Sequence, residues 1–381
     1  MNKITLSIAA LALSAASAFA STPDELINNT KKAVAPDARQ IVYEISSEQL
    51  PDGKVILRGK TSEQDVKNAL MQAFADDGKQ VIDSVTVFPT DKWAQVRISV
   101  CCFRTGPAHA AEMATQGIMG QPIRLLEKKG DWWRAQTPDG YIAYVVDNSL
   151  AEKSDDQMRQ WRTAPRVIVT APYQTHVYYN AVDRGPRDVV SDVVLGNILE
   201  GTYNPEAEVM EVTLPDGRKG FIATADVQPL DTWAQQSFDA EKILDTAYSM
   251  EGTPYLWGGT SIKTLDCSGL AKVSYFSNGI ILMRDASQQA LTGNNIAPDQ
   301  WRTCEAGDLL FFGNPKTGKV THVAIYDHDG DYIHSSGRVR RNSVDPESEK
   351  YLTTPFLHAT RIKDSIGSNG ITTVAAHPWY F

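Results

Sequence analysis

The chain has 381 residues, of which 42% are hydrophobic and 22% charged, and its formal net charge is −9. This length exceeds one ordinary domain and predicts two to four. An acidic chain with no basic cluster and no nucleic-acid motif does not favour phosphate backbones, so we expect no nucleic-acid partner.

Residues 1–20 have the pattern of a secretory signal peptide. Lys3 gives a short positive start, residues 4–16 are apolar, and AFA at 18–20 is a small-x-small cleavage site. The run is too short to span a membrane, and no cysteine for a lipid anchor follows the cut at Ser21. A buried N-terminal helix is the alternative. We predict a periplasmic or secreted protein without a membrane anchor; cleavage would change the net charge to −10, because Lys3 is the only charged residue removed.

A small α/β domain is expected over residues 21–92. Two runs alternate apolar and polar residues, and a Ser-initiated run with 3.6-residue periodicity buries Val66, Leu70 and Phe74 before a further strand. The expected elements are strands at 40–46, 54–60 and 81–89 and a helix at 62–78. No residue pattern here indicates chemistry, which favours a packing or spacer role.

Short strands separated by turn residues follow, and they predict two all-β domains at 93–152 and 160–232. The first set of strands is expected at 94–103, 120–130, 131–138 and 141–146, and the second at 166–172, 192–204 and 209–227. TPDGYIAYV at 137–145 and LPDGRKGFI at 214–222 form an internal repeat. The pattern resembles tandem bacterial SH3-like barrels. An amphipathic helix is then expected over 231–250, before a last domain at 236–381.

The stretch TLDCSGLAKVSYF at 264–276 places a cysteine at the start of a predicted helix, which Asp266 or Ser268 caps and Gly279 ends. Cys267 could be a core residue, half of a disulfide or a nucleophile. Four cysteines are too few for a disulfide scaffold, and a helix N-terminus favours a thiolate. We therefore predict that Cys267 is a nucleophile with a pKa below the ordinary ~8.5. An inert, buried state remains open for Cys101, Cys102 and Cys304.

A histidine pair can serve this thiol. VTHVAIYDHDGDYIHSSG at 320–337 predicts a hairpin that turns at His328 and brings His322 and His334 nearly opposite each other. That permits a relay in which His322 takes the thiol proton and His334 orients the ring of His322. The same Cys–His–His set could bind zinc, but the chain has no C-x-x-C or H-E-x-x-H motif. We expect nucleophilic chemistry with no metal and no cofactor.

Five ordered motifs carry a family resemblance: PYLWGG, DCSGL, GDLLFFG, THVAIYD and IHSSG. Together they resemble the NlpC/p60 family of papain-like cysteine peptidases. The resemblance implies an α+β fold, here preceded by two SH3-like barrels and the N-terminal α/β unit. It also implies cleavage of γ-D-glutamyl bonds to a diamino acid in peptidoglycan peptides. Cys267 matches the nucleophile, His322 the base, His334 the third polar residue and Tyr255 a tyrosine beside the cleft. Gly307-Asp308 matches a structural pair that opens a strand.

The barrels extend the resemblance to γ-D-glutamyl-L-diamino acid endopeptidases of the dipeptidyl-peptidase VI type. In these the first barrel roofs the cleft, and its Glu and Tyr hold the free amine of an N-terminal L-Ala. Glu112 and Tyr141, with Tyr144 as alternative, match those residues. Further substrate contacts match Asp266, Ser268, Asp285, Ala286 and Ser287. One departure is Met283, where the family often has Pro.

The resemblance thus predicts a peptidase for peptidoglycan-derived peptides that releases L-Ala-D-Glu. A non-catalytic wall-binding protein is one alternative, and retention of Cys267, His322 and His334 argues against it. An amidase cutting the sugar–peptide bond is another; such enzymes usually carry Glu, Asp or Asn as the third residue. The sequence does not distinguish meso-diaminopimelate from L-lysine, and it predicts no oligomeric state.

Overall fold

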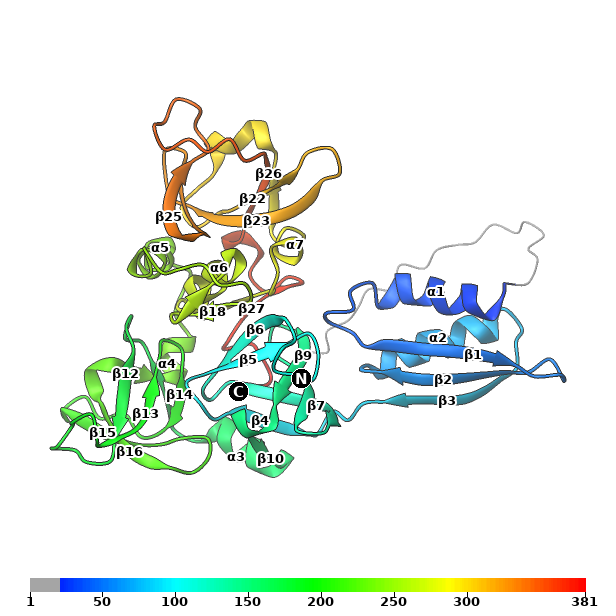
Figure 1. The fold of residues 1–381 in the computed structure, drawn as a ribbon, viewed down its shortest axis with the longest axis horizontal. Coiled ribbons are helices and arrows are strands. Elements are labelled where there is room, and N and C mark those ends of the chain that lie inside the picture. The colour runs from blue at the N-terminus through cyan, green and yellow to red at the C-terminus, as the bar shows by residue number, and fades with distance from the viewer. Residues whose placement is uncertain (1–20) are drawn as a thin grey trace. The chain divides into compact units, whose positions relative to one another are not determined.

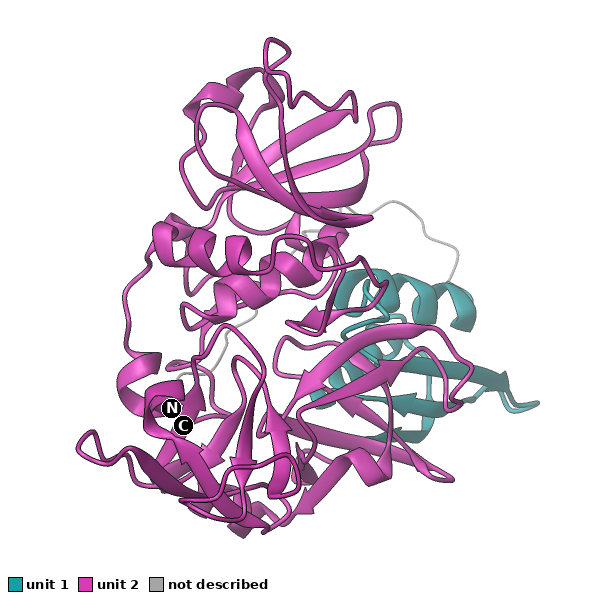
Figure 2. Cartoon of the chain, turned by 60° about the vertical axis from the view of Figure 1, so that its left-hand side comes forward, with its two compact units in different colours: residues 1–88 teal, residues 89–381 magenta. Residues whose placement is uncertain are grey.

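The computed structural model describes residues 21–381, so the predicted signal peptide lies outside the described residues. The described residues form two compact units, 21–88 and 89–381 (Figure 2). Within the described part, no helix is both long and apolar enough to cross a membrane.

The first unit is the expected α/β unit. Its elements are α1 (Pro23–Val34), β1 (Tyr43–Gln49), β2 (Val55–Thr61), α2 (Gln64–Asp76) and β3 (Val81–Val87). Strands β1 and β2 pair antiparallel, and α2 connects β2 to its parallel neighbour β3. The predicted stripe of Val66, Leu70 and Phe74 lies in the core of this unit.

Helix α1 was not expected from the apolar periodicity, although a local signal for it exists. Thr22 accepts a hydrogen bond from the backbone of Glu25, and the Glu25 carboxylate accepts one from the backbone of Thr22. Pro23 occupies the first turn, where its missing N–H costs nothing. The sequence TPDE therefore encodes a capping box that starts the helix.

The first barrel, which is cyan to green in Figure 1, forms one seven-stranded sheet. Its strand order is β10-β4-β7-β8-β9-β5-β6. Its elements are β4 (Trp93–Val96), β5 (Val100–Arg104), β6 (Met113–Ile118), β7 (Pro122–Lys129), β8 (Trp132–Gln136), β9 (Ile142–Val146), η1 (Asp147–Ser149) and β10 (Leu150–Lys153). The single strand expected at 94–103 is wrong. The chain bends between β4, which pairs with β7 and β10, and β5, which pairs with β6 and β9. Cys101 is a buried free thiol in this barrel's core.

The second barrel repeats this plan after α3 (Asp155–Thr163), with strand order β13-β12-β16-β15-β14-β11-β17. Its elements are β11 (Arg166–Val169), β12 (Thr175–Tyr178), β13 (Val189–Val193), β14 (Ile198–Glu200), β15 (Val209–Thr213), β16 (Lys219–Ala223), η2 (Thr224–Asp226) and β17 (Val227–Pro229). The sequence repeat is also a structural one. Gly140 N donates to Thr137 O, and Gly217 N donates to Leu214 O, both at 2.9 Å.

The continuous helix expected over 231–250 is wrong. Two helices occupy this stretch, α4 (Leu230–Ala234) and α5 (Ala240–Ser249). Asp239 begins the second helix, because its side chain accepts a hydrogen bond from Lys242 N. Asn278 Oδ1 accepts from Asp239 N and holds the break in place. Phe238 therefore precedes the helix and packs against Tyr275.

The last part of the chain is the expected α+β fold. Its six-stranded sheet has the order β21-β26-β22-β23-β24-β25, and α6 packs against it through a shared core (Figure 1). Its helices are α6 (Cys267–Phe276), α7 (Ala286–Gln289), η3 (Pro298–Thr303) and η4 (Lys363–Ser365). The sheet strands are β21 (Asn294–Ile296), β22 (Leu309–Asn314), β23 (Lys319–Tyr326), β24 (Asp331–Ser336), β25 (Arg338–Ser343) and β26 (Phe356–Arg361). Two short pairs complete it: β18 (Thr260–Ser261) with β19 (Thr264–Leu265), and β20 (Ile280–Leu282) with β27 (Ile371–Thr373).

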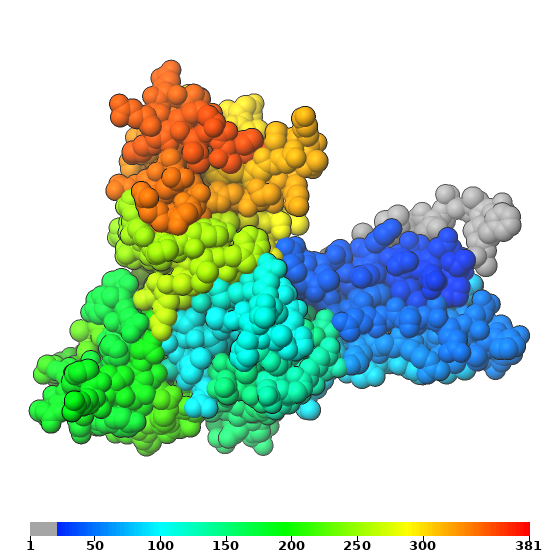
Figure 3. All heavy atoms as spheres, viewed as in Figure 1, coloured from blue at the N-terminus to red at the C-terminus, as the bar shows by residue number. Residues whose placement is uncertain are grey.

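The first barrel is attached directly to this fold, as the adjoining cyan and yellow-green surfaces show in Figure 3. Gln116 Oε1 accepts from Thr260 N at 2.8 Å, and Thr260 Oγ1 accepts from Gln116 N at 3.0 Å. These two hydrogen bonds join β6 to β18. The domain limits expected inside residues 89–381 remain predictions, because this whole segment forms one compact unit.

Candidate active site

Cys267 is the first residue of α6, as predicted, and Asp266 caps that helix by accepting from Gly269 N at 2.7 Å. The buried thiol lies within hydrogen-bond reach of the backbone N–H groups of Ser268 and Val323. Since Val323 follows His322 in β23, the fold brings the nucleophile and the candidate base to the same place.

The two histidines meet across the predicted hairpin. His322 Nε2 and His334 Nδ1 lie 2.7 Å apart, and the rings meet edge to face. Ile325 stands opposite Ile333, so the histidines are diagonal neighbours on one face rather than direct partners. His322 and His334 are nevertheless within hydrogen-bond distance of each other, as expected.

A residue that the sequence did not indicate completes this chain of hydrogen bonds. Asn342 Nδ2 donates to Lys350 O at 3.0 Å, so its Oδ1 is the atom that faces His334 Nε2, also at 3.0 Å. An amide oxygen can only accept, and His334 Nε2 must therefore carry the proton. His334 Nδ1 is then the acceptor for His322 Nε2–H. The unprotonated nitrogen of His322 is Nδ1, the form that a base requires.

The expectation of a lowered thiol pKa is wrong. Burial, with the Asp266 carboxylate adding to it, raises the pKa of Cys267 to about 11. Burial, together with His334, lowers the pKa of His322 to about 3, and burial lowers the pKa of His334 to about 4. Desolvation of the charged forms outweighs the helix dipole. In the resting state Cys267 is therefore a neutral thiol and His322 a neutral imidazole.

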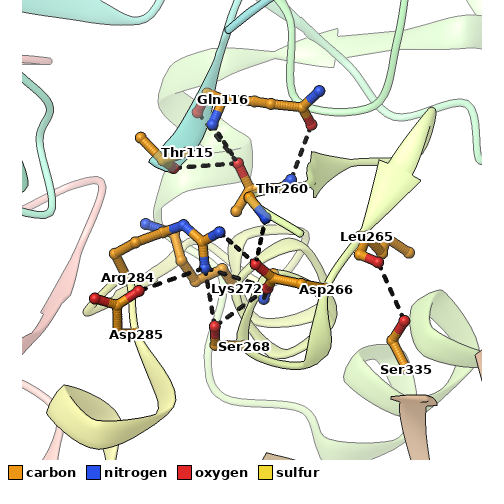
Figure 4. A network of polar contacts seen from close by, with 12 residues as sticks. Thr115, Gln116, Thr260, Leu265, Asp266, Ser268, Lys272, Arg284, Asp285 and Ser335 are labelled. Carbon is orange, nitrogen blue, oxygen red and sulfur yellow. Dashed lines mark hydrogen bonds and ion pairs between the residues drawn. The ribbon is translucent and has the colours of Figure 1, made fainter. Parts of the chain in front are cut away.

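A buried ionic network surrounds the helix start (Figure 4). Arg284, only 1% exposed, donates to Asp266 Oδ2 at 2.5 Å and to Ser268 Oγ at 2.9 Å. Asp266 Oδ2 also accepts from Gly258 N at 2.9 Å. Asp266 and Ser268, both expected to contact substrate, thus also connect the cap of α6 to Arg284. The sequence reasoning missed Arg284, although it directly precedes Asp285.

The expected contacts after Arg284 lie on α7. Asp285 is its N-cap and shares a capping box with Gln288, Ala286 is buried and Ser287 is half-buried. Gln289 Nε2 donates to Met283 O at 2.9 Å and to Ser268 O at 3.3 Å. The backbone at Met283 is therefore part of an ordered turn that is tied to the nucleophile helix.

The barrel supplies the remaining expected residues. A Cβ atom on Gly258, which has φ +83°, would lie 2.5 Å from Met113 O, so only glycine lets the PYLWGG loop approach this backbone. Glu112, which is exposed, directly precedes Met113. The position of Glu112 is thus at the contact between the barrel and the loop that carries Tyr255.

The structure separates the two candidate tyrosines. Tyr141 lies close enough to Arg284 for its charge to affect the pKa of that guanidinium, whereas the Tyr144 hydroxyl accepts from Lys129 at 3.1 Å. This favours Tyr141 as the tyrosine that faces the site. Burial raises the pKa of Tyr255, with the charges of Cys267 and Asp266 adding to the effect. The backbone of Tyr255 forms a parallel bridge with Leu265, two residues before Cys267, so this tyrosine lies close to the start of α6.

Comparisons with known proteins identify the family of the last part of the chain and of its first barrel. Residues 252–361 match the profile of the NlpC/P60 family, and residues 103–150 match that of the bacterial dipeptidyl-peptidase Sh3 domain. The chain is similar to the gamma-D-glutamyl-L-lysine dipeptidyl-peptidase of Bacillus subtilis, with 38% identity over 236 residues that cover 58% of this chain and 71% of that protein. A protein of the same name from Bacillus cereus is 27% identical over 312 residues, covering 76% and 86%.

A solved structure supports the fold. The crystal structure of an NlpC/P60 family protein from Bacillus cereus superposes with a TM-score of 0.61 at 23% identity, and the match covers 71% of this chain and 99% of that one. Over the described residues, no group of three His, Cys, Asp or Glu side chains is arranged to hold a metal ion.

Proposed function

The chain belongs to the NlpC/P60 family of peptidases that act on peptidoglycan peptides, and we propose that it cuts the bond between the γ-carbonyl of D-Glu and a diamino acid. The substrate carries a free N-terminal L-Ala, and the product is L-Ala-D-Glu. The observation that carries this proposal is the chain of hydrogen bonds from Asn342 through His334 to His322, beside Cys267.

In the proposed reaction His322 Nδ1 takes the proton of the Cys267 thiol while the sulfur attacks the γ-carbonyl carbon. The hydroxyl of Tyr255 and the N–H groups at the start of α6 stabilise the oxyanion. The imidazolium then protonates the amine of the diamino acid, which leaves, and a thioester remains on Cys267. Water, deprotonated by His322, hydrolyses the thioester and regenerates the thiol.

His334 and Asn342 position the base in this scheme. Their two hydrogen bonds set the tautomer of His322 and place the new positive charge beside an acceptor, His334 Nδ1. A histidine as third member supplies no negative charge. The imidazolium is therefore short-lived, which matches the neutral resting pair that burial favours.

Substrate selection is proposed to come from the barrel and α7. Glu112 and Tyr141 bind the L-Ala ammonium, while Asp266 and Ser268 line the path of the D-Glu residue. Asp285, Ala286 and Ser287 complete that path at the start of α7. A wall peptide still joined to muramic acid has no ammonium and would leave Glu112 without its partner. The enzyme thus processes released peptides, in the periplasm or outside the cell.

The test is a digestion of L-Ala-γ-D-Glu-meso-diaminopimelate and of the L-lysine analogue, followed by mass spectrometry. L-Ala-D-Glu and the free diamino acid are the expected products from at least one peptide. Cleavage between N-acetylmuramic acid and L-Ala in a muramyl peptide, with both tripeptides left intact, would instead support the amidase alternative.

A further inference from the structure

The helix that carries the nucleophile is bound to the first barrel by a buried ion pair that the proposed mechanism does not use. Lys272, five residues after Cys267 in α6, pairs with the carboxylate of Asp139. The side chains are 17% and 3% exposed, respectively. Burial works to raise the pKa of Asp139, but Lys272 and the Thr137 hydroxyl together hold it below its usual value. The carboxylate is therefore charged in the interior.

Asp139 belongs to the turn that leads directly into Tyr141. Thr137 Oγ1 donates to Asp139 Oδ1 at 2.5 Å, and Thr137 N donates to Tyr141 O at 2.9 Å. His377 Nε2 lies 2.9 Å from Pro138 O on the other side of the turn. These bonds make residues 137–141 a rigid piece, so a movement of Asp139 moves Tyr141.

Two ion pairs and one electrostatic interaction form a circuit from α6 through the barrel turn and back to the start of α6. Lys272 pairs with Asp139, whose turn contains Tyr141; the charge of Tyr141 acts on Arg284, and Arg284 pairs with Asp266, the cap residue of the nucleophile helix. Both ends of the circuit thus lie on α6. The circuit fixes the barrel tyrosine relative to the sulfur through one rigid helix.

We propose that Lys272 and Asp139 are positioning residues that set where the first barrel stands over the cleft and thereby determine selectivity for a free N-terminal amine. The inference rests on the proposed function. It deepens that function, because it assigns specificity to a pair that touches neither the substrate nor the reacting atoms. Neither the resemblance nor the motifs of the catalytic fold indicate such a pair.

The second barrel offers a matched control. Asp216 occupies the position of Asp139 in the second PDG turn, and it pairs with Arg97 at 3.1 Å. This pair joins the two barrels to each other rather than the barrel to the catalytic helix. It is also a more exposed pair, with side chains 39% and 12% exposed for Arg97 and Asp216.

The experiment compares Lys272→Met and Arg97→Met in the full chain on the tripeptide L-Ala-γ-D-Glu-L-Lys and its N-acetylated form. For Lys272→Met we expect KM for the free tripeptide to rise roughly 10- to 100-fold, the range for a displaced charged hydrogen bond. The preference for the free amine should fall by a similar factor. The rate of Cys267 alkylation by iodoacetamide and kcat should stay within about threefold, as should all values for Arg97→Met.

An unchanged preference for the free amine in Lys272→Met overturns the inference, and so does a parallel loss of kcat and alkylation rate, which would place the effect on the nucleophile. The isosteric Asp139→Asn and the double variant Lys272→Met/Asp139→Asn keep the test valid if an unpaired buried carboxylate prevents folding. Both should show the same loss of preference. A wild-type protein that leaves both the L-lysine and the meso-diaminopimelate tripeptides uncut refutes the proposed function itself, and that result is distinct from a preference that survives the variants. If the wild type cuts only the meso-diaminopimelate tripeptide, the same comparison of variants is made on that peptide and its N-acetylated form.

Discussion

Replacement of His334 by alanine tests the relay at the position where the structure gives the sharpest expectation. The variant removes the acceptor that lies 2.7 Å from His322 Nε2 and leaves Asn342 Oδ1 without its donor at 3.0 Å. His322 can then protonate on either nitrogen and rotate. Loss of such orientation costs roughly 10²- to 10⁴-fold in kcat, the range for general acid–base assistance.

KM should change little, because His334 is 1% exposed and lies behind His322. The assay is steady-state cleavage of the free tripeptide, together with the rate of Cys267 alkylation at neutral pH, which should fall in parallel. The control is His358→Ala, because this histidine stacks on Phe311 in the same sheet but lies outside the relay. We expect its kcat to stay within about threefold. A wild-type kcat for His334→Ala would refute the reasoning and make His334 an ordinary strand residue.

Two further predictions concern stability. Burial lowers the pKa of His334 in the folded protein to about 4. The neutral side chain therefore contributes its full share to the free energy of unfolding above the unfolded pKa of 6.5, and this share is lost as the pH falls toward 4. We expect the free energy of unfolding in urea to decrease by about 3 kcal/mol across that window, with His322 adding in the same direction; a smaller loss in His334→Gln would support the assignment, and an equal one would contradict it. Gly258→Ala should lose about 2 kcal/mol more than Gly252→Ala, because both glycines have positive φ but only Gly258 faces Met113 O. Equal melting temperatures for the two variants would show that the barrel does not constrain this loop.

Local signals account for what the sequence predicted well. The cap at Asp266 and the periodicity after it place a helix start at Cys267, and a His-Asp-Gly turn with flanking alternation places His322 and His334 on one hairpin. These features depend on neighbours a few residues away. The structure places both where the sequence predicts them, and the fold class is also as expected.

The features that the sequence did not predict depend on contacts between residues that are far apart in the chain. Asn342 comes from β25, and only the register of β24 with β25 brings it to His334. Arg284 acquires its partner when the chain after β20 passes the start of α6, and the raised pKa of Cys267 results from burial that no local pattern encodes. The interruption between α4 and α5 differs, because a local signal decides it. The cap at Asp239 begins a new helix although the apolar periodicity across this stretch predicts one continuous helix.

The measurement that tests the central claim most directly is mass spectrometry of the free tripeptide after incubation with the wild type and with Cys267→Ala. We predict L-Ala-D-Glu from the wild type, none from the variant, and binding of intact peptide by the variant. Undiminished cleavage by Cys267→Ala, or release of L-Ala alone by the wild type, would contradict thiol catalysis at the γ-D-glutamyl bond.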